Sequence, residues 1–104
     1  MKLEITKLLY YYDIPTLFIC EDINQNDYIF TLFTDVEYIG LKVSDEQKML
    51  FLNGKIDLRT IFVKNNTDFL IGAFINNEEI EVVKYTGEIN DDILPDYGLI
   101  YREK

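Results

Sequence analysis

Carboxylates are the side chains of this sequence whose number and spacing are suited to chemistry. The 104 residues include 19 Asp and Glu and only 10 Lys and Arg, with no His, so the formal net charge is −9 at pH 7. Without histidine, the chain lacks the side chain that most often transfers protons near neutral pH. Two uses of the acids remain: catalysis by paired carboxylates, and recognition of a positively charged surface.

Adjacent acids can serve acid–base catalysis when an apolar setting shifts the pKa of one carboxyl group, and they can bind a metal ion that they share. We predict that the four such pairs all fall in loops, helix caps or exposed strand positions, where solvated charge explains them better than catalysis. The pairs are Glu21 with Asp22, Asp45 with Glu46, Glu78 with Glu79, and Asp91 with Asp92.

The segment from Asp22 to Asn26 begins like the calcium loop of an EF-hand, with oxygen-bearing side chains at alternate positions. It then departs from that pattern, because Asp27 occupies the position that needs glycine and Phe33 the position that needs a bidentate glutamate. The only cysteine, Cys20, lies in an apolar run and is predicted to be a buried core residue. We therefore expect no metal site, no cofactor and no catalytic residue.

The acids are concentrated toward the end of the chain. Between residues 76 and 96 the only base is Lys84, and the acids are Glu78, Glu79, Glu81, Glu88, Asp91, Asp92 and Asp96. Such a surface either keeps the protein soluble or imitates the phosphates of a nucleic acid. Glu79 and Glu81 would project from one face of a strand about 7 Å apart, close to a phosphate repeat. Direct binding to nucleic acid or to an anionic membrane is disfavoured, since both require Lys and Arg.

Two further groups are candidates for binding. In a strand, Tyr10, Tyr11 and Tyr12 would alternate between faces, so at least one would be exposed as an aromatic contact of the kind enriched at protein interfaces. Arg59 lies in the first turn of a predicted helix. It either pairs with Asp57 or another carboxylate, or holds an anionic ligand or a partner's carboxylate in a bidentate manner.

The elements that position these side chains are mostly strands. Residues 3–12 fit both helical spacing and strand alternation, and the three tyrosines favour a strand. Residues 16–21 and 28–34 predict a hairpin. Residues 36–43 predict a third strand with one wetter face, and residues 69–75 predict a strand covered on both sides.

Two short helices are predicted after the third strand. Residues 44–47 form a capping box, with Met49, Leu50 and Leu52 as the expected buried stripe and Gly54 as the terminator. Asp57 is predicted to cap a second helix that buries Leu58, Ile61 and Phe62.

The remaining segments complete the predicted sheet. A two-residue turn at Asn76-Asn77 leads into a strand over residues 78–83, with Ile80 and Val82 inward. Residues 86–97 predict a loop and residues 98–101 a short final strand. The expected fold is α+β: one domain over residues 1–104, built on an antiparallel sheet of five to seven strands, with one or two short helices inserted before the last hairpin.

Three segments carry a resemblance to a known family: residues 12–18 (Tyr-Asp-Ile-Pro-Thr-Leu-Phe), Tyr28, and residues 58–62 (Leu-Arg-Thr-Ile-Phe). Over roughly residues 8–63 the chain resembles a small prokaryotic family known as a domain of unknown function, which implies no activity. In size, acidity and lack of catalytic equipment it is also similar to small phage inhibitors of bacterial defence systems and to bacterial immunity proteins.

The sequence therefore predicts a non-enzymatic binding protein that occupies a basic surface of a nucleic-acid-handling partner. The residues expected to carry this function are Glu78, Glu79, Glu81, Asp91, Asp92, Tyr10, Tyr11 and Tyr12. Two alternatives stay open: a small-molecule binder that holds a nucleotide-like anion through Arg59 and tyrosine, and an immunity or antitoxin-type protein. The absence of a signal-peptide pattern and of an apolar run of about 20 residues predicts a cytoplasmic location. Exposed strand edges would permit a homodimer.

Overall fold

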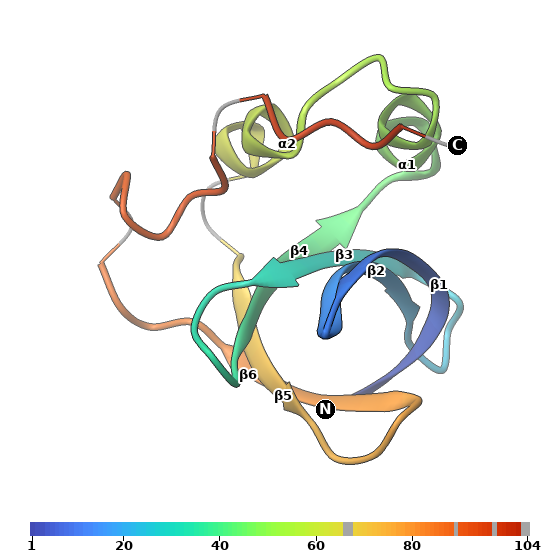
Figure 1. Cartoon of the computed structure of the whole chain (residues 1–104), viewed down its shortest axis with the longest axis vertical. Coiled ribbons are helices and arrows are strands. Elements are labelled where there is room, and N and C mark those ends of the chain that lie inside the picture. Colours follow the sequence, from blue (N-terminus) through green and yellow to red (C-terminus); the bar gives the residue numbers. More distant parts are fainter. Residues whose placement is uncertain (66–67, 89, 97, 103–104) are drawn as a thin grey trace.

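Six antiparallel strands form a closed barrel in the computed structural model of this chain, and two helices lie between the fourth and fifth strands (Figure 1). The structure describes residues 1–65, 68–88, 90–96 and 98–102. The elements are β1 (Lys2–Tyr12), β2 (Ile14–Glu21), β3 (Asp27–Leu32), β4 (Tyr38–Val43), α1 (Asp45–Leu52), α2 (Leu58–Lys64), β5 (Leu70–Phe74) and β6 (Glu79–Lys84).

The long first strand closes the barrel. β1 pairs with β6 through Lys2, Leu3 and Glu4, and with β2 from Glu4 onward. Its ladder with β2 is irregular at several points between Ile5 and Tyr11. Irregularities of this kind bend a strand and increase its twist, which a small barrel requires.

Closure corrects the predicted fold class. The expectation of an α+β sheet with inserted helices was wrong, because the molecule is mainly a closed β-barrel. The strand number falls within the predicted range, and every pairing is antiparallel. The β1–β6 pairing joins the first strand to the last strand, and alternation within a strand carries no information about so distant a partner.

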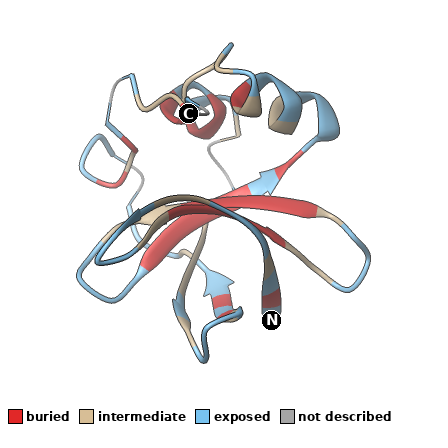
Figure 2. Ribbon diagram, turned by 45° about the vertical axis from the view of Figure 1, so that its right-hand side comes forward, coloured by how far each residue is buried: buried red, intermediate tan, exposed pale blue. Residues whose placement is uncertain are grey.

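β2, β3 and β4 are buried on both faces and separate two cores (Figure 2). Alternate side chains of these strands point into the barrel, where they meet side chains of β1 and β6. Together they form the lumen core: Leu3, Phe18, Cys20, Tyr28, Phe30, Tyr38, Ile80 and Val82. The others point toward the helices and form the outer core, which includes Leu17, Ile19, Ile29, Ile39, Leu41 and Val43. This double burial explains why the hairpin strands are apolar without alternation.

The lumen core settles two sequence predictions. Cys20 is fully buried, as predicted, and burial raises the pKa of its thiol to about 12. The wetter face predicted for the third strand was wrong for Tyr38 and Gly40, which lie inside the barrel, whereas Lys42 on the same face is exposed. Tyr38 packs edge-on against Phe18 with ring centroids 5.1 Å apart, and its hydroxyl donates to the carbonyl oxygen of Pro15 at 2.7 Å.

Helix α1 begins and ends as the sequence predicts. The Ser44 hydroxyl accepts from the Gln47 amide, and the Gln47 side chain accepts from the Ser44 amide, each at 3.1 Å. At the other end Gly54 has a φ of 70°, and the amides of Gly54 and Lys55 bond to the carbonyls of Phe51 and Leu50. This is a Schellman motif.

The buried face of α1 differs from the prediction. Phe51 is its one fully buried residue, whereas Met49 and Leu50 are exposed and Leu52 is half-buried. The stripe was wrong because Phe51 packs against Tyr101 of the C-terminal segment, a partner that the helix pattern cannot reveal. An ion pair of 2.7 Å between Lys48 and the buried Asp27 also fixes α1 to the start of β3.

Helix α2 and the C-terminal segment complete the outer core. Asp57 caps α2 by accepting from the Thr60 amide at 2.9 Å, and α2 buries Leu58, Ile61 and Phe62 as predicted. Residues 98–101 run along the helices without joining the sheet, so the predicted final strand was wrong (Figure 1). The β5–β6 turn spans residues 75–78, longer than the predicted two residues.

Candidate functional site

Three carboxylates stand directly opposite one another on three adjacent strands. Glu21 of β2 pairs with Glu4 of β1, and Glu4 also pairs with Glu79 of β6. We call these three residues the acidic row. Neighbouring strands lie about 4.8 Å apart, so the row places three negative charges on one outer face at close spacing.

The lumen core dictates the orientation of the acidic row. Leu3, Cys20 and Ile80 each precede or follow a row residue and point into the barrel. Because successive side chains of a strand point to opposite faces, all three row carboxylates must point outward. The row lines a surface hollow of about 320 Å³ together with Asp22 and Lys2.

Asp22 extends the acidic row but is committed to its own loop. Its carboxylate accepts from the amides of Asn24 and Asn26, from the Asn26 side chain and from the Tyr28 hydroxyl, at 2.9 to 3.0 Å. These bonds, first those from Asn26, lower the pKa of Asp22 to about 2. Burial and the neighbouring carboxylate raise the pKa of Tyr28 to about 12. The loop that begins like a calcium site is thus organised around one carboxylate.

We expect Asp22→Asn to remove a pH-dependent part of the stability. The pKa of Asp22 is lower in the folded protein, about 2, than its ordinary value of 3.8. Its carboxylate therefore stabilises the fold fully above about pH 4, and that contribution disappears as the pH falls toward 2. Melting temperatures from pH 7 to pH 2 should show a gap between wild type and Asp22→Asn that closes with acidification. The exposed Asp35→Asn is the control, and a gap that stays constant with pH would contradict the assignment.

The structure divides the acids that the sequence grouped together. Glu78, Glu79 and Glu81 lie on the β5–β6 hairpin, whereas Asp91 and Asp92 belong to the C-terminal segment, where Asp91 pairs with Arg59 of α2. That segment turns away from the β5–β6 hairpin toward the helices (Figure 1). Only Glu79 belongs to the acidic row. Its carboxylate accepts from the Asn76 side chain at 2.9 Å, and Glu81 stands opposite Lys2.

Glu4 and Glu21 are the residues that sequence reasoning missed. Glu4 is an isolated acid in its strand, and Glu21 was noted only as the neighbour of Asp22, so no local pattern connects them to each other or to Glu79. Their importance follows from the register in which β1 meets both β2 and β6. Only a prediction of barrel closure and register together could have brought them beside Glu79.

The three tyrosines separate into one structural and two exposed residues. The Tyr10 hydroxyl donates to the carbonyl of Ile100 at 3.0 Å and accepts from the amide of Arg102 at 2.9 Å. Tyr11 is 63% exposed and Tyr12 is 84% exposed, at the tip of the β1–β2 hairpin. At least one exposed tyrosine was predicted, and the structure presents two.

Arg59 is buried and holds the C-terminal segment. Its guanidinium donates to the carbonyl of Pro95 at 3.1 Å and to the carboxylate of Asp91 at 2.7 Å. Asp57, named as its first expected partner, instead caps α2 and accepts from the amide of Gly98 at 3.1 Å. The charge of Arg59 is thus already used inside the protein, and its ion pair with Asp91 lies at the surface, since the Asp91 side chain is 87% exposed.

The described residues hold no group of three or more His, Cys, Asp or Glu side chains arranged to bind a metal ion. Within the same residues, none of the helices has the length and apolar character needed to cross a membrane. No family model, curated protein or solved structure matches this chain.

Proposed function

We propose that this chain is a non-enzymatic binding protein whose acidic row docks on a basic, nucleic-acid-binding surface of a partner protein and blocks it. The observation that carries the proposal is the register that sets Glu21, Glu4 and Glu79 side by side. Like charges directly opposite each other in a sheet destabilise it, each pair by up to about 1 kcal/mol. Lys or Arg side chains of a partner would turn this repulsion into attraction.

The surroundings of the row suit such a partner. Along β6, Glu81 lies about 7 Å from Glu79. Its carboxylate is already paired with the N-terminal ammonium group of Met1 at 3.3 Å and stands opposite Lys2, so the acidic row itself has to supply the charge for binding. A net charge of −9 would steer a basic partner toward this protein and speed the encounter. Tyr11 and Tyr12, at the far end of the same strand as Glu4, supply exposed aromatic surface for a second contact.

We infer that the partner is a nuclease or a nucleic-acid-binding regulator in the cytoplasm. The small size and acidity of the chain, similar to those of phage inhibitors of bacterial defence systems, favour this class. An immunity or antitoxin role would use the same surface against a toxin.

The test compares two variants with the same change in charge. Glu4→Lys, Glu21→Lys and Glu79→Lys together reverse the acidic row, whereas Asp35→Lys, Glu88→Lys and Asp96→Lys reverse three exposed acids elsewhere. In the first variant three like charges still face one another, so repulsion between the strands is retained. Each protein is used to capture partners from a lysate of the native host, followed by affinity measurements on the purified partner in 150 mM salt.

We expect the row variant to bind the captured partner at least tenfold more weakly, and the control variant to bind within threefold of wild type. Added DNA or RNA should compete with the wild-type protein for the partner. If both variants lose the same amount of affinity for the partner, the net charge of the protein rather than the acidic row is responsible for binding. A partner that nucleic acid does not displace would contradict the proposed class.

A further inference from the structure

The only Asn–Gly dipeptide of the sequence lies at the C-terminal end of α1, at Asn53 and Gly54. In such a pair the backbone nitrogen of the glycine can attack the side-chain carbonyl of the asparagine, because glycine has no Cβ atom to obstruct the approach. Asn53 is exposed, so water reaches it. The pair and its exposure make Asn53 a candidate site of deamidation, a covalent modification that needs no enzyme.

The reaction consumes only water. A bond forms between the Gly54 nitrogen and the side-chain Cγ of Asn53, and the bond from Cγ to the side-chain nitrogen breaks. That nitrogen leaves as ammonia, with the proton that the Gly54 nitrogen gives up. Water then opens the resulting five-membered ring at either of its two carbonyls and leaves an aspartate or an isoaspartate. An amide has become a carboxylate, and nothing is oxidised or reduced.

The folded end of α1 opposes this reaction in two ways. The Gly54 amide donates to the Phe51 carbonyl at 3.1 Å, so the attacking nitrogen is already engaged. Asn53 has a ψ of 4°, whereas ring closure requires the Gly54 nitrogen to lie in one plane with the Cβ and Cγ atoms of Asn53, which this ψ does not allow. Both obstacles disappear only when the helix end opens.

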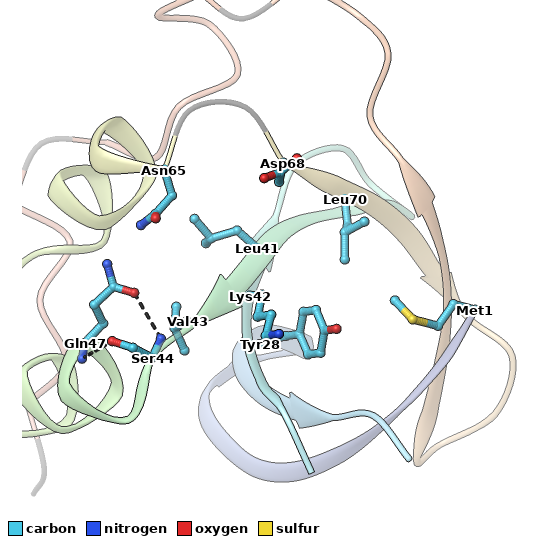
Figure 3. A pocket seen from close by; sticks show the side chains of 10 residues that line it. All are labelled: Met1, Tyr28, Leu41, Lys42, Val43, Ser44, Gln47, Asn65, Asp68 and Leu70. Carbon is cyan, nitrogen blue, oxygen red and sulfur yellow. Dashed lines mark hydrogen bonds between the residues drawn. The ribbon is translucent and has the colours of Figure 1, made fainter. Parts of the chain in front are cut away.

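The two ends of α1 are secured differently. Its start is closed by the side chains of Ser44 and Gln47, each of which bonds to the backbone amide of the other (Figure 3). Its end is closed by backbone hydrogen bonds, and its last turn has no basic residue to bond the free carbonyls. The stability of this end therefore depends on what packs over it.

The C-terminal segment lies over Gly54. A Cβ atom at Gly54 would be 3.3 Å from the Tyr101 carbonyl oxygen and 3.7 Å from the Ile100 side chain. The Tyr101 ring packs against Phe51, whose carbonyl holds the Gly54 amide, with ring centroids 6.5 Å apart. Release of the segment would therefore remove the contacts on both residues of that hydrogen bond.

We propose that Asn53 is a deamidation site that the C-terminal segment shields and that reacts when this segment leaves the helices. The product makes the opening permanent. A new carboxylate at the C-terminal end of a helix is disfavoured by the helix dipole. An isoaspartate also adds a methylene group to the backbone inside the turn that Gly54 closes. Release of the segment is thus converted into a covalent change at Asn53.

The test compares the deamidation rate of Asn53 in the full chain and in a blocked synthetic peptide of residues 51–56, by mass spectrometry at neutral pH. Nothing restrains the Asn53–Gly54 pair in the peptide, which therefore gives the unshielded rate. We expect the full chain to react at least tenfold more slowly. The Gly54 amide should be protected from hydrogen exchange by at most the same factor, since exchange requires only rupture of its bond to Phe51.

Two variants loosen the segment at different contacts. Tyr101→Ala removes the ring that packs on Phe51, and Arg59→Met removes the bond to the Pro95 carbonyl. We expect each variant to deamidate at least threefold faster than wild type. Val82→Ala is the matched control, because it lowers the stability of the lumen core away from α1, and its rate should stay within twofold of wild type.

Three results would overturn the proposal. A full chain that reacts as fast as the peptide would show that the fold does not shield Asn53. Equal acceleration by Val82→Ala would place the reaction in the globally unfolded chain. Unchanged rates in both loosened variants, while exchange of their Leu58 amide is faster, would show that the segment is not the shield. If Tyr101→Ala does not fold, Arg59→Met and the exchange of Gly54 in wild type decide the question.

Asn53→Gln identifies the reacting amide. It keeps an amide side chain but cannot form the five-membered ring, so the tryptic peptide that contains residue 53 should gain no carboxylate even when the segment is loosened. A gain in that peptide would contradict the assignment to Asn53. No binding partner enters these measurements, so their outcome is independent of the proposed function.

Discussion

Gly40→Val is expected to unfold the barrel or to lower its free energy of unfolding by more than about 4 kcal/mol, a large share of the 5–15 kcal/mol typical of a domain. A Cβ atom at this position would lie 2.5 Å from the Ile29 carbonyl oxygen and 2.5 Å from the Phe30 ring. The first contact is with backbone, which cannot move without breaking the β3–β4 ladder. The second is with a ring stacked on Phe18 in the lumen core, with centroids 5.9 Å apart.

Valine would therefore overpack the lumen core and separate two paired strands at once. The matched control is Ala73→Val, on the exposed outer face of β5, where the same side chain has space and suits a strand. Urea unfolding followed by circular dichroism measures both variants. Ordinary overpacking already costs about 1–3 kcal/mol. If the free energy of unfolding of Gly40→Val stays within about 1 kcal/mol of wild type, β3 and β4 are not as close at Gly40 as described.

Arg59→Met is expected to release the C-terminal segment and to cost about 2–3 kcal/mol, the range for lost hydrogen bonds to a charged group. Arg59 is 8% exposed, and its bond to the buried Pro95 carbonyl holds this segment against α2. Methionine retains much of the apolar volume but leaves the carbonyl without its charged donor. The Leu58 amide donates to the Leu99 carbonyl at 2.9 Å, so its hydrogen exchange with solvent should become faster when the C-terminal segment is released.

Asp91→Asn is the control that separates the two bonds of Arg59. The Asp91 side chain is 87% exposed, so solvent screens its ion pair with Arg59. Exposed pairs contribute about 0–1 kcal/mol, and we expect Asp91→Asn to stay within that range. A larger loss for Asp91→Asn than for Arg59→Met would show that the ion pair, rather than the buried hydrogen bond, secures the segment.

Local sequence was enough to predict the parts of the fold whose partners are a few residues away. The capping box at Ser44 and the cap at Asp57 are confirmed, because a helix start is stabilised by side chains within its own first turn. The β2–β3 hairpin is confirmed for the same reason: its two strands are joined by a short loop. Burial of Cys20 was predicted from the apolar run around it.

Prediction was weaker for the candidate site. The direction of Glu79 and Glu81 followed from alternation in their own strand, and both do point outward from β6. The grouping with Asp91 and Asp92 followed only from proximity in sequence. The fold places Asp91 against Arg59 of α2, and Asp92 lines a hollow with residues at the end of β3. Proximity in sequence is a poor guide here because the chain leaves the barrel wall after β6 and continues as a separate segment that packs against α2.

The amino-acid sequence was sufficient to predict where the helices begin, that Cys20, Ile80 and Val82 are buried, and that the chain carries a strong excess of acids. The pairing of β1 with β6, and with it the alignment of Glu21, Glu4 and Glu79, could be seen only in the folded barrel. The physical reason is that period-two alternation fixes the face of each residue but not its neighbour across the sheet. Those neighbours are set by closing the barrel, a constraint shared by the whole chain.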